Sequence, residues 1–265
     1  MTRLALVGGG RMGEALVGGL LRAGWAEPAD LVVVEPLEGR RAEVAAAHPG
    51  IRVCAGLAEV GSVEGAVVAV KPDVVESVCA TLGGLEVGRV LSIAAGVTLG
   101  RIEAALGRPV PAVRAMPNTP ALVGAGAAAI AAGSSAGEAD LAWAEGILGA
   151  VGTVVRVKEP LLDAVTGLSG SGPAYVFLVV EALIEAGVLN GLPRDTSREL
   201  AVGTVLGAAR LLAETGDDPA ALRAAVTSPA GTTAEGLRAL EDHAVRAAFV
   251  AAVTAAADRS RQLAG

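Results

Sequence analysis

Aromatic residues and cysteines are scarce in this 265-residue chain. Phe, Trp and Tyr make up 2% of the residues, so the core must be packed from Ala, Val, Leu and Gly. The two cysteines, Cys54 and Cys79, form no CxxC pair and no metal-ligand cluster with His48 and His243. Such usage is typical of a reducing cytosol, and we expect buried, unreactive thiols, no metal and a cytoplasmic location.

The chain also lacks a basic patch. Its net charge is -7 and its sequence pI is about 5.0, so nucleic acid phosphates and anionic membrane surfaces would bind poorly. The most apolar stretch, Pro173 to Val180, stops at Glu181 and is short of the roughly 20 residues that a transmembrane helix needs. The first strand runs directly into a glycine loop, without a signal peptide. We expect a soluble protein with neither nucleic acid nor membrane as a partner.

Strong acids and bases suited to redox chemistry are few. The only tyrosine, Tyr175, is followed four residues later by Val179, so the Tyr–Lys pair of short-chain dehydrogenases is missing. No lysine follows residue 158, which disfavours β-hydroxyacid dehydrogenases, because these use a lysine of their helical domain for proton transfer. His48 lies in a His-Pro-Gly turn and His243 lies between two helices, so surface roles suit both better than proton transfer.

Short β-rich runs alternate with helical stretches in the first part of the chain. These runs are apolar on both faces, which predicts a parallel sheet covered by helices. The expected strands are Arg3–Val7, Leu31–Glu35, Ile51–Cys54, Ala66–Val70, Val90–Ile93, Val110–Ala115, Gly126–Ala132 and Thr153–Val157. The expected helices between them are Met12–Ala23, Leu37–Ala47 and Ala136–Gly149.

After Val157 the strand pattern ends, and Lys158-Glu159-Pro160 is a plausible joint. The helices expected beyond it are Leu161–Leu168, Ala174–Leu189, Arg194–Glu214, Pro219–Val226, Thr232–Glu241 and Ala244–Leu263. We predict an α/β fold with two domains. Residues 1–158 form a Rossmann-type, doubly wound sheet, and residues 159–265 form an all-helical domain.

The segment Ala174–Leu189 is apolar on nearly every face except at Glu181 and Glu185. Such a helix needs burial all round, which a domain of about a hundred residues barely offers. We expect a second subunit to bury part of it. The alternative is a central helix in a monomeric bundle.

The run Gly8-Gly9-Gly10-Arg11-Met12-Gly13 has GxGxxG spacing, directly after a strand and at the start of a helix. In a dinucleotide site the first glycine permits the tight turn, the second lets the backbone approach a pyrophosphate, and the third packs helix on strand. The helix N-terminus then presents free N–H groups to the phosphates. We therefore assign Gly8, Gly10, Arg11, Met12 and Gly13 to a cofactor site.

Glu35 ends the second strand, 22 residues after Gly13. An acidic side chain there accepts hydrogen bonds from the adenosine ribose hydroxyls and repels a 2′-phosphate. Arg40 and Arg41 begin the next helical turn and could reach such a phosphate. The cofactor is NADH or NADPH, and Glu35 favours NADH.

The segment Val226–Leu237 is the most informative part of the helical half. Thr232 and Glu235 have capping-box spacing, so a helix is expected to begin there. The small residues ahead of it could form a nest of N–H groups for a carboxylate, beside the hydroxyls of Ser228, Thr232 and Thr233. The alternative is an ordinary capped helix start. A hydride enzyme without an obvious strong acid suits an imine, which is already electrophilic once it is protonated on nitrogen.

The loop from Thr227 to Thr233 resembles the Ser/Thr-Ser-Pro-x-Gly-x-Thr signature of pyrroline-5-carboxylate reductases. Further blocks match this family in the same order, which chance does not explain. They are Gly8–Gly13, Ala69–Pro72, Ser92–Val97, Arg114–Pro120 and Leu168–Tyr175. In many members Ser, Thr, Asn or Arg follows the second strand and suits NADP, whereas this chain has Glu35-Pro36-Leu37.

The resemblance implies a Rossmann domain, a helical dimerisation domain, and an oxidoreductase of proline biosynthesis that reduces the C=N bond of 1-pyrroline-5-carboxylate to give L-proline. It also implies a homodimer, which some members assemble into a homodecamer, with active sites between the nucleotide domain of one subunit and the helical domain of its partner. Ala69, Lys71 and Pro72 would flank the nicotinamide. Asn118 would bind substrate at the end of its strand, unless it only forms an Asx-type turn. Ser169–Pro173 reads better as a structural helix start.

The mechanism that follows places the catalytic groups in the loop around Ala230. Backbone N–H groups of Gly231 and Thr232 and the hydroxyl of Ser228 would hold the substrate carboxylate. Thr233 would hydrogen-bond the ring nitrogen, so that positioning carries most of the catalysis. The rival hypotheses are a reductase of another cyclic imine on the same scaffold, a non-catalytic NAD(H)-binding sensor, and a scaffolding protein.

Overall fold

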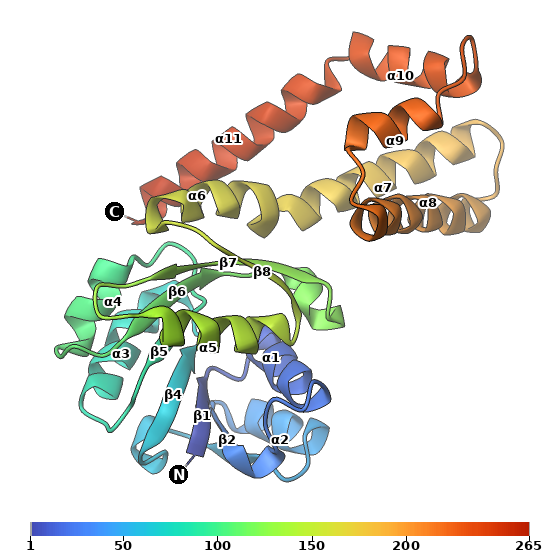
Figure 1. Cartoon of the computed structure of the whole chain (residues 1–265). Helices are drawn as coiled ribbons and strands as arrows, with labels where there is room; N and C mark the ends of the chain where they lie inside the picture. The colour runs from blue at the N-terminus through green and yellow to red at the C-terminus, as the bar shows by residue number, and fades with distance from the viewer. Residues whose placement is uncertain (1, 265) are drawn as a thin grey trace. The chain divides into compact units, whose positions relative to one another are not determined.

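The computed structural model describes residues 2–264 of the chain (Figure 1). Its contacts divide the chain into two compact units. One comprises the residues up to Ser171 together with those from Thr254 onward, and the other comprises Gly172–Val253. The first unit therefore extends beyond residue 158, where the sequence placed the domain boundary, and it includes the end of the last helix.

The first unit is built on an eight-stranded sheet of order β3-β2-β1-β4-β5-β6-β7-β8. All eight predicted strands are present. Their bounds are β1 Thr2–Val7, β2 Leu31–Val34, β3 Arg52–Cys54, β4 Val63–Val68, β5 Val90–Ser92, β6 Ala112–Met116, β7 Gly126–Ala132 and β8 Gly152–Arg156. The sheet forms because these runs, rich in Val, Ala and Leu, bury both faces.

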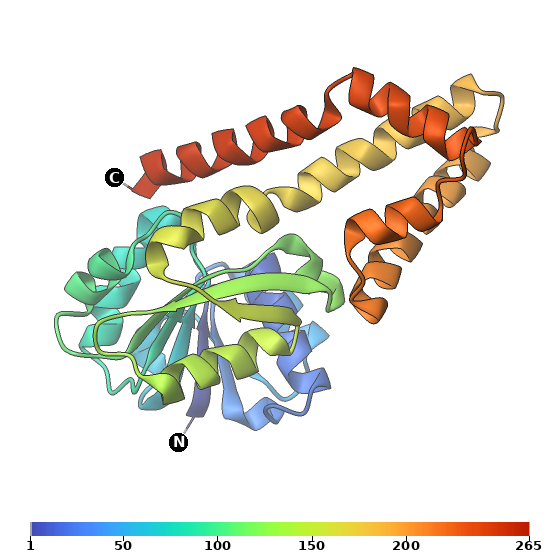
Figure 2. The same cartoon turned by 45° about the horizontal axis from the view of Figure 1, so that its top comes forward.

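The parallel sheet predicted for the first six strands is confirmed. Of the later pair that closes the domain, β7 runs antiparallel to β6, and β8 runs parallel to β7. The connection between β6 and β7 holds only the single 3-10 turn Thr119–Val123. A parallel pair needs a crossover of a dozen or more residues, usually a helix, so this short connection returns the chain antiparallel. Figure 2 shows β7 and β8 at one edge of the sheet, with α5 beside them.

Helices cover both faces of the sheet (Figure 1). On one face lie α1 Arg11–Arg22, α2 Glu38–Ala47 and α5 Glu138–Gly149. On the other lie α3 Val75–Gly83, α4 Leu99–Leu106 and α6 Leu162–Val165. The sequence pattern did not single out α3 or α4. Helices on both faces of a largely parallel sheet make this a doubly wound fold, as predicted.

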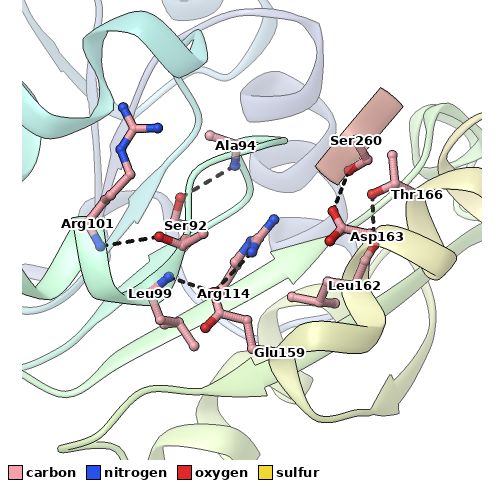
Figure 3. Close-up of polar contacts among 11 residues, drawn as sticks. Ser92, Ala94, Leu99, Arg101, Arg114, Glu159, Leu162, Asp163, Thr166 and Ser260 are labelled. Atoms are coloured by element: carbon pink, nitrogen blue, oxygen red, sulfur yellow. Dashed lines mark hydrogen bonds and ion pairs between the residues drawn. The ribbon is translucent and has the colours of Figure 1, made fainter. Parts of the chain in front are cut away.

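Buried polar groups hold the segment after β8 to the sheet (Figure 3). The guanidinium of Arg114 on β6 pairs with Glu159 at 3.0 Å, and the same carboxylate oxygen accepts the N–H of Leu99 at 2.6 Å, at the first residue of α4. Nearby, the hydroxyl of Ser260 donates to Asp163 at 2.6 Å. These contacts connect residues 159–163 with β6, α4 and the end of the last helix within this unit.

The second unit is all helical, as predicted. Its helices are α7 Gly172–Leu189, α8 Arg194–Thr215, α9 Pro219–Ala225, α10 Thr232–Asp242 and the first part, up to Val253, of α11 Val245–Ala264. α7 and α8 approach closely at Gly187, where a Cβ would lie 2.1 Å from the hydroxyl oxygen of Ser197. That hydroxyl donates to the carbonyl of Ile184 at 2.8 Å, which fixes the crossing.

α7 has no buried residue within the single chain, and Phe177 and Leu178 are 62% and 65% exposed. It continues a helical run that starts at Glu159 and includes the π-helical turn Thr166–Gly170. This run, Glu159–Leu189, is by length and composition alone the one candidate for a membrane-crossing helix in the described part of the chain. The sequence argument that the apolar stretch is too short for a span was therefore wrong, because it counted residues only to Glu181.

Candidate active site

A cleft of about 610 Å³ opens at the carboxyl ends of the parallel strands. It lies where β1 is flanked by β2 and β4, the point at which strand order reverses and where doubly wound folds bind ligands. The lining residues are Val7, Gly8, Gly10, Val34, Glu35, Pro36, Leu37, Ala55, Leu57, Ala69, Val70, Lys71, Val74 and Val78. The apolar residues of this lining were not predicted from the sequence. Leu37 and Ala55 could have been found, because each lies within two residues after the end of a predicted strand.

The glycine loop has the close approaches that the spacing predicts. Gly8 has φ +111°, and a Cβ there would lie 2.5 Å from the carbonyl oxygen of Ala69. A Cβ on Gly13 would lie 2.1 Å from the carbonyl oxygen of Gly8, so the first turn of α1 rests directly on the loop. A Cβ on Gly10 would meet no atom within 4 Å, and no side chain caps α1. The open face at Gly10 and the uncapped helix N-terminus fit a pyrophosphate.

Glu35 is the buried acidic group of the cleft, with only 7% of its surface exposed. One carboxylate oxygen accepts the N–H of Gly9 at 3.0 Å, and the other accepts the N–H of Leu37 at 2.9 Å. The side chain therefore ties the glycine loop to the end of β2 and holds a fixed negative charge in the cleft.

Arg40 and Arg41 are both engaged within the protein. Arg40 donates to the carbonyl of Gly9 at 2.6 Å and pairs with Glu14 and Glu43, and hydrogen bonds to these two carboxylates raise the pKa of Arg40. Arg41 donates to the carbonyl oxygens of Glu35 and Pro36, at 3.0 and 2.7 Å. The phosphate-binding role that the sequence allowed for them would require these contacts to break.

The other predicted cofactor residues are distributed around the cleft. Ala69 and Lys71 line it, and Lys71 has the extended backbone expected before Pro72, which begins a 3-10 turn. Met12 packs against the core of the sheet, and Arg11 lines a separate groove on α1. The structure thus brings Gly8, Gly10, Glu35, Ala69 and Lys71 together and leaves the side chains of Arg11 and Met12 outside.

Asn118 follows β6 at the same edge of the sheet and is 9% exposed. Its amide oxygen accepts the N–H of Ala127 at 2.9 Å, and its amide nitrogen donates to the carbonyl of Ser169 at 3.0 Å. The side chain therefore connects β7 with the π-helical turn, and substrate binding by Asn118 stays a prediction.

The predicted substrate loop lies in the second unit, between α9 and α10. The N–H of Gly231 donates to the carbonyl of Ser228 at 3.0 Å, closing a turn over Pro229 and Ala230. Ala230 has φ +54°, a left-handed conformation that costs a non-glycine residue about 1–2 kcal/mol. Strain of this kind persists where the surrounding structure requires it, as at ligand sites. Because the turn uses the Gly231 N–H, that group is less available to a substrate than the sequence argument assumed.

The predicted start of α10 at Thr232 is confirmed, but the capping box is wrong. Gly231 is the N-cap residue, no side chain caps the helix, and Glu235 pairs instead with Arg238 at 2.7 Å. Among the described residues, no partner occupies the N–H groups of Thr232 and Thr233. Thr233 is half-buried beside them, whereas Ser228 and Thr232 are exposed.

The remaining reactive side chains take no part in either region. Burial raises the pKa of Cys79 to about 11 and also raises that of Cys54, so both thiols stay protonated at neutral pH. This confirms the prediction of buried thiols. His243 is exposed at the end of α10, but His48 is half-buried, contrary to the surface role expected for it.

Comparison with known proteins identifies the family of this chain. Residues 159–263 match the family model described as pyrroline-5-carboxylate reductase dimerisation, and residues 3–96 match that described as NADP oxidoreductase, coenzyme F420-dependent. Pyrroline-5-carboxylate reductase of Synechocystis is 47% identical over 98% of both chains, and that of Escherichia coli is 38% identical over the same shares. The chain belongs to the pyrroline-5-carboxylate reductase family.

Solved structures agree with this membership. The pyrroline-5-carboxylate reductase of Coxiella burnetii is 36% identical, with a TM-score of 0.93 over 100% of this chain and 99% of that one. The Plasmodium falciparum enzyme, solved with NADP bound, is 30% identical, with a TM-score of 0.86 over 100% and 98%. The chain is thus a nicotinamide-dependent oxidoreductase that acts on a C=N group. The exposed apolar surface of α7 belongs to a dimerisation domain rather than to a monomeric bundle.

Proposed function

We propose that this reductase holds the carboxylate of 1-pyrroline-5-carboxylate at the N-terminus of α10. The uncapped N–H groups of Thr232 and Thr233 are the observation that carries this proposal. A helix N-terminus favours an anion through its free N–H groups and its dipole. The exposed hydroxyl of Ser228 adds a donor, and the left-handed Ala230 and the Gly231 N-cap give the loop its shape.

Thr233 orients the imine. Its hydroxyl lies on the first turn of α10, beside the carboxylate-binding amides, and hydrogen-bonds the ring nitrogen. The imine takes a proton from water, and the reduced nicotinamide, when bound in the cleft, supplies hydride to the C=N carbon. The product is a neutral secondary amine, so no developing alkoxide needs an oxyanion hole. The protein therefore contributes to catalysis chiefly by positioning the imine and the coenzyme.

We further propose a preference for NADH over NADPH. Three features support it: the fixed negative charge of Glu35 in the cleft, the internal pairing of Arg40, and the internal hydrogen bonds of Arg41. A 2′-phosphate would meet a carboxylate with no free guanidinium from these two residues. The NADP-bound relative from Plasmodium falciparum shows that members of the family do take NADP.

The assembly that we propose is a cytoplasmic homodimer, or a larger ring of dimers such as a decamer. The acidic charge of -7 and the dimerisation match support a soluble oligomer.

Purified enzyme with pyrroline-5-carboxylate should oxidise NADH faster than NADPH, followed by loss of reduced-nicotinamide absorbance. Thr233→Ala should lower kcat/KM by about ten- to a hundredfold, the value of one hydrogen bond to a charged group, while Thr233→Ser retains most activity. Coenzyme affinity should not change. Absence of turnover by a folded protein that binds NADH would refute the reaction, and equal activity of Thr233→Ala would refute the role of the hydroxyl.

A further inference from the structure

A second hollow in the first unit lies along the outer face of α1. It has a volume of about 220 Å³ and is lined by Arg11, Glu14, Ala15, Gly18, Arg22, His48 and Leu122. None of these residues lines the coenzyme cleft. The lining residues that belong to α1 are spaced three, four or seven positions apart. They therefore lie along one face of the helix, and this face points towards the end of α2.

The charge in this groove is positive. Among the residues that the structure describes, Arg11 and Arg22 make no ion pair and their side chains make no hydrogen bond. The one carboxylate in the lining, Glu14, is neutralised by Arg40. Two guanidinium groups therefore face the groove without an anionic partner.

His48 supplies the second, independent observation. Its Nε2 atom is buried and has no hydrogen-bond partner among the described residues. A buried polar atom without a partner costs about 1–3 kcal/mol, and such groups usually mark a bound water or ion. His48 closes α2 as its C-cap residue, and the imidazole points towards α1 rather than into solvent.

Gly18 forms the floor between these two side chains. A Cβ at this buried position would lie 3.0 Å from Nη1 of Arg22 and 3.4 Å from Cε1 of His48. The guanidinium and the imidazole therefore converge over the same backbone atom. Glycine inside a helix costs about 1 kcal/mol relative to alanine, yet alanine here would occupy the space between them.

We propose that this groove binds a phosphate group, held by the guanidinium of Arg22 and the Nε2–H of His48 over Gly18. Arginine suits phosphate because its planar donors match two oxygens at once. A tetrahedral anion leaves further oxygens for the imidazole, and Arg11 adds positive potential from the other end of the groove. The phosphate can be inorganic or can belong to a nucleoside monophosphate, since both present the same dianion.

Equilibrium dialysis of radiolabelled orthophosphate against the full-length protein tests this site without turnover, so its result does not depend on the proposed reaction. We expect saturable binding of one phosphate per chain. Arg22→Gln and His48→Phe should each weaken it by about tenfold or more, the value of one charge-assisted hydrogen bond. Gly18→Ala should weaken it similarly while leaving the melting temperature unchanged or higher.

Arg101→Gln is the matched control. It removes the same charge from α4 on the opposite face of the sheet and should bind phosphate normally. Saturating NADH should not displace the phosphate. Tighter binding of AMP than of phosphate would identify a nucleotide site, and equal binding would identify an inorganic phosphate site.

Three results would overturn the proposal. They are no saturable binding, binding that none of the three groove variants alters, and displacement by NADH, which would place the phosphate in the pyrophosphate subsite of the coenzyme. If His48→Phe fails to fold, Arg22→Gln and Gly18→Ala decide the question, because neither removes a buried contact of the core.

Discussion

The carboxylate of Glu35 ties the glycine loop to the end of β2 and also lines the cleft that we propose for the coenzyme. It accepts the N–H groups of Gly9 in the glycine loop and of Leu37, three positions beyond β2, and it is buried in the lining of the cleft. A neutral residue would keep part of this hydrogen bonding but not the charge. Coenzyme preference can therefore be separated from loop structure at this single position.

Glu35→Gln should shift the ratio of kcat/KM values for NADPH and NADH towards NADPH by about tenfold, because like charges near a protein surface repel by several kcal/mol before screening. Steady-state kinetics with both coenzymes measure the ratio. The shift should shrink as salt rises. An unchanged ratio at low ionic strength would mean that Glu35 does not face the 2′-position.

Ala230 carries the strain of the substrate loop. Ala230→Val should raise the KM for the imine by about tenfold, because a β-branched residue at φ +54° forces the turn to change and moves the α10 amides. Ala244 is a matched control, with φ +55° between α10 and α11. Ala244→Val should lower the free energy of unfolding by about 1 kcal/mol, as Ala230→Val does, and it should leave KM unchanged. An equal rise of KM in both variants would show a global effect instead.

At the scale of elements, the strand–loop–helix unit of β1 and α1 reveals which glycines the fold requires. Gly8 and Gly13 sit where any Cβ would collide with backbone, whereas Gly10 faces open space. The fold therefore requires glycine at positions 8 and 13, whereas position 10 has room for a Cβ, and we propose that the pyrophosphate approaches there.

Gly10→Ala should therefore leave the melting temperature unchanged but weaken NADH binding by at least about tenfold, since a methyl group would displace the hydrogen bonds between phosphate and backbone. Gly100→Ala, on α4 and also without neighbours within 4 Å, should bind NADH normally. Calorimetric titration and thermal melting separate the two effects. Normal affinity in Gly10→Ala would move the pyrophosphate away from this loop.

At the scale of the molecule, α7 leaves an apolar surface uncovered in the single chain. Val176, Phe177, Leu178 and Leu183 are 44% to 65% exposed in the single chain, and apolar side chains gathered on a protein surface often mark an interaction site. A charge placed there would have to be buried in the dimer without a partner.

Phe177→Glu should reduce the mass in solution from an even multiple of 26.0 kDa towards a single chain, with loss of activity, as light scattering after gel filtration would show. Ala42→Glu, an equal charge on the exposed surface of α2, should leave the mass unchanged. An unaltered oligomer in Phe177→Glu would mean that another face forms the contact.

Local patterns in the sequence determined much of this protein. The alternation of apolar runs gave all eight strands, because burial on both faces leaves a clear signal, and the glycine spacing predicted the tight loop between β1 and α1. The segment Ala174–Leu189, apolar on nearly every face, predicted a helix that is buried partly by a second subunit. The family signature predicted the reaction.

The tertiary structure decided what depends on partners distant in sequence. The antiparallel pairing of β7 with β6 joins residues of two different strands. The capping box is absent because the helix begins with Gly231, which has no side chain, as its N-cap residue. The pairing of Arg40 with Glu14, 26 residues away, and the burial of His48 against Gly18 have no local signal. Spacing along the chain predicts which groups can meet within one element, but only packing determines which competing partner each charged group selects.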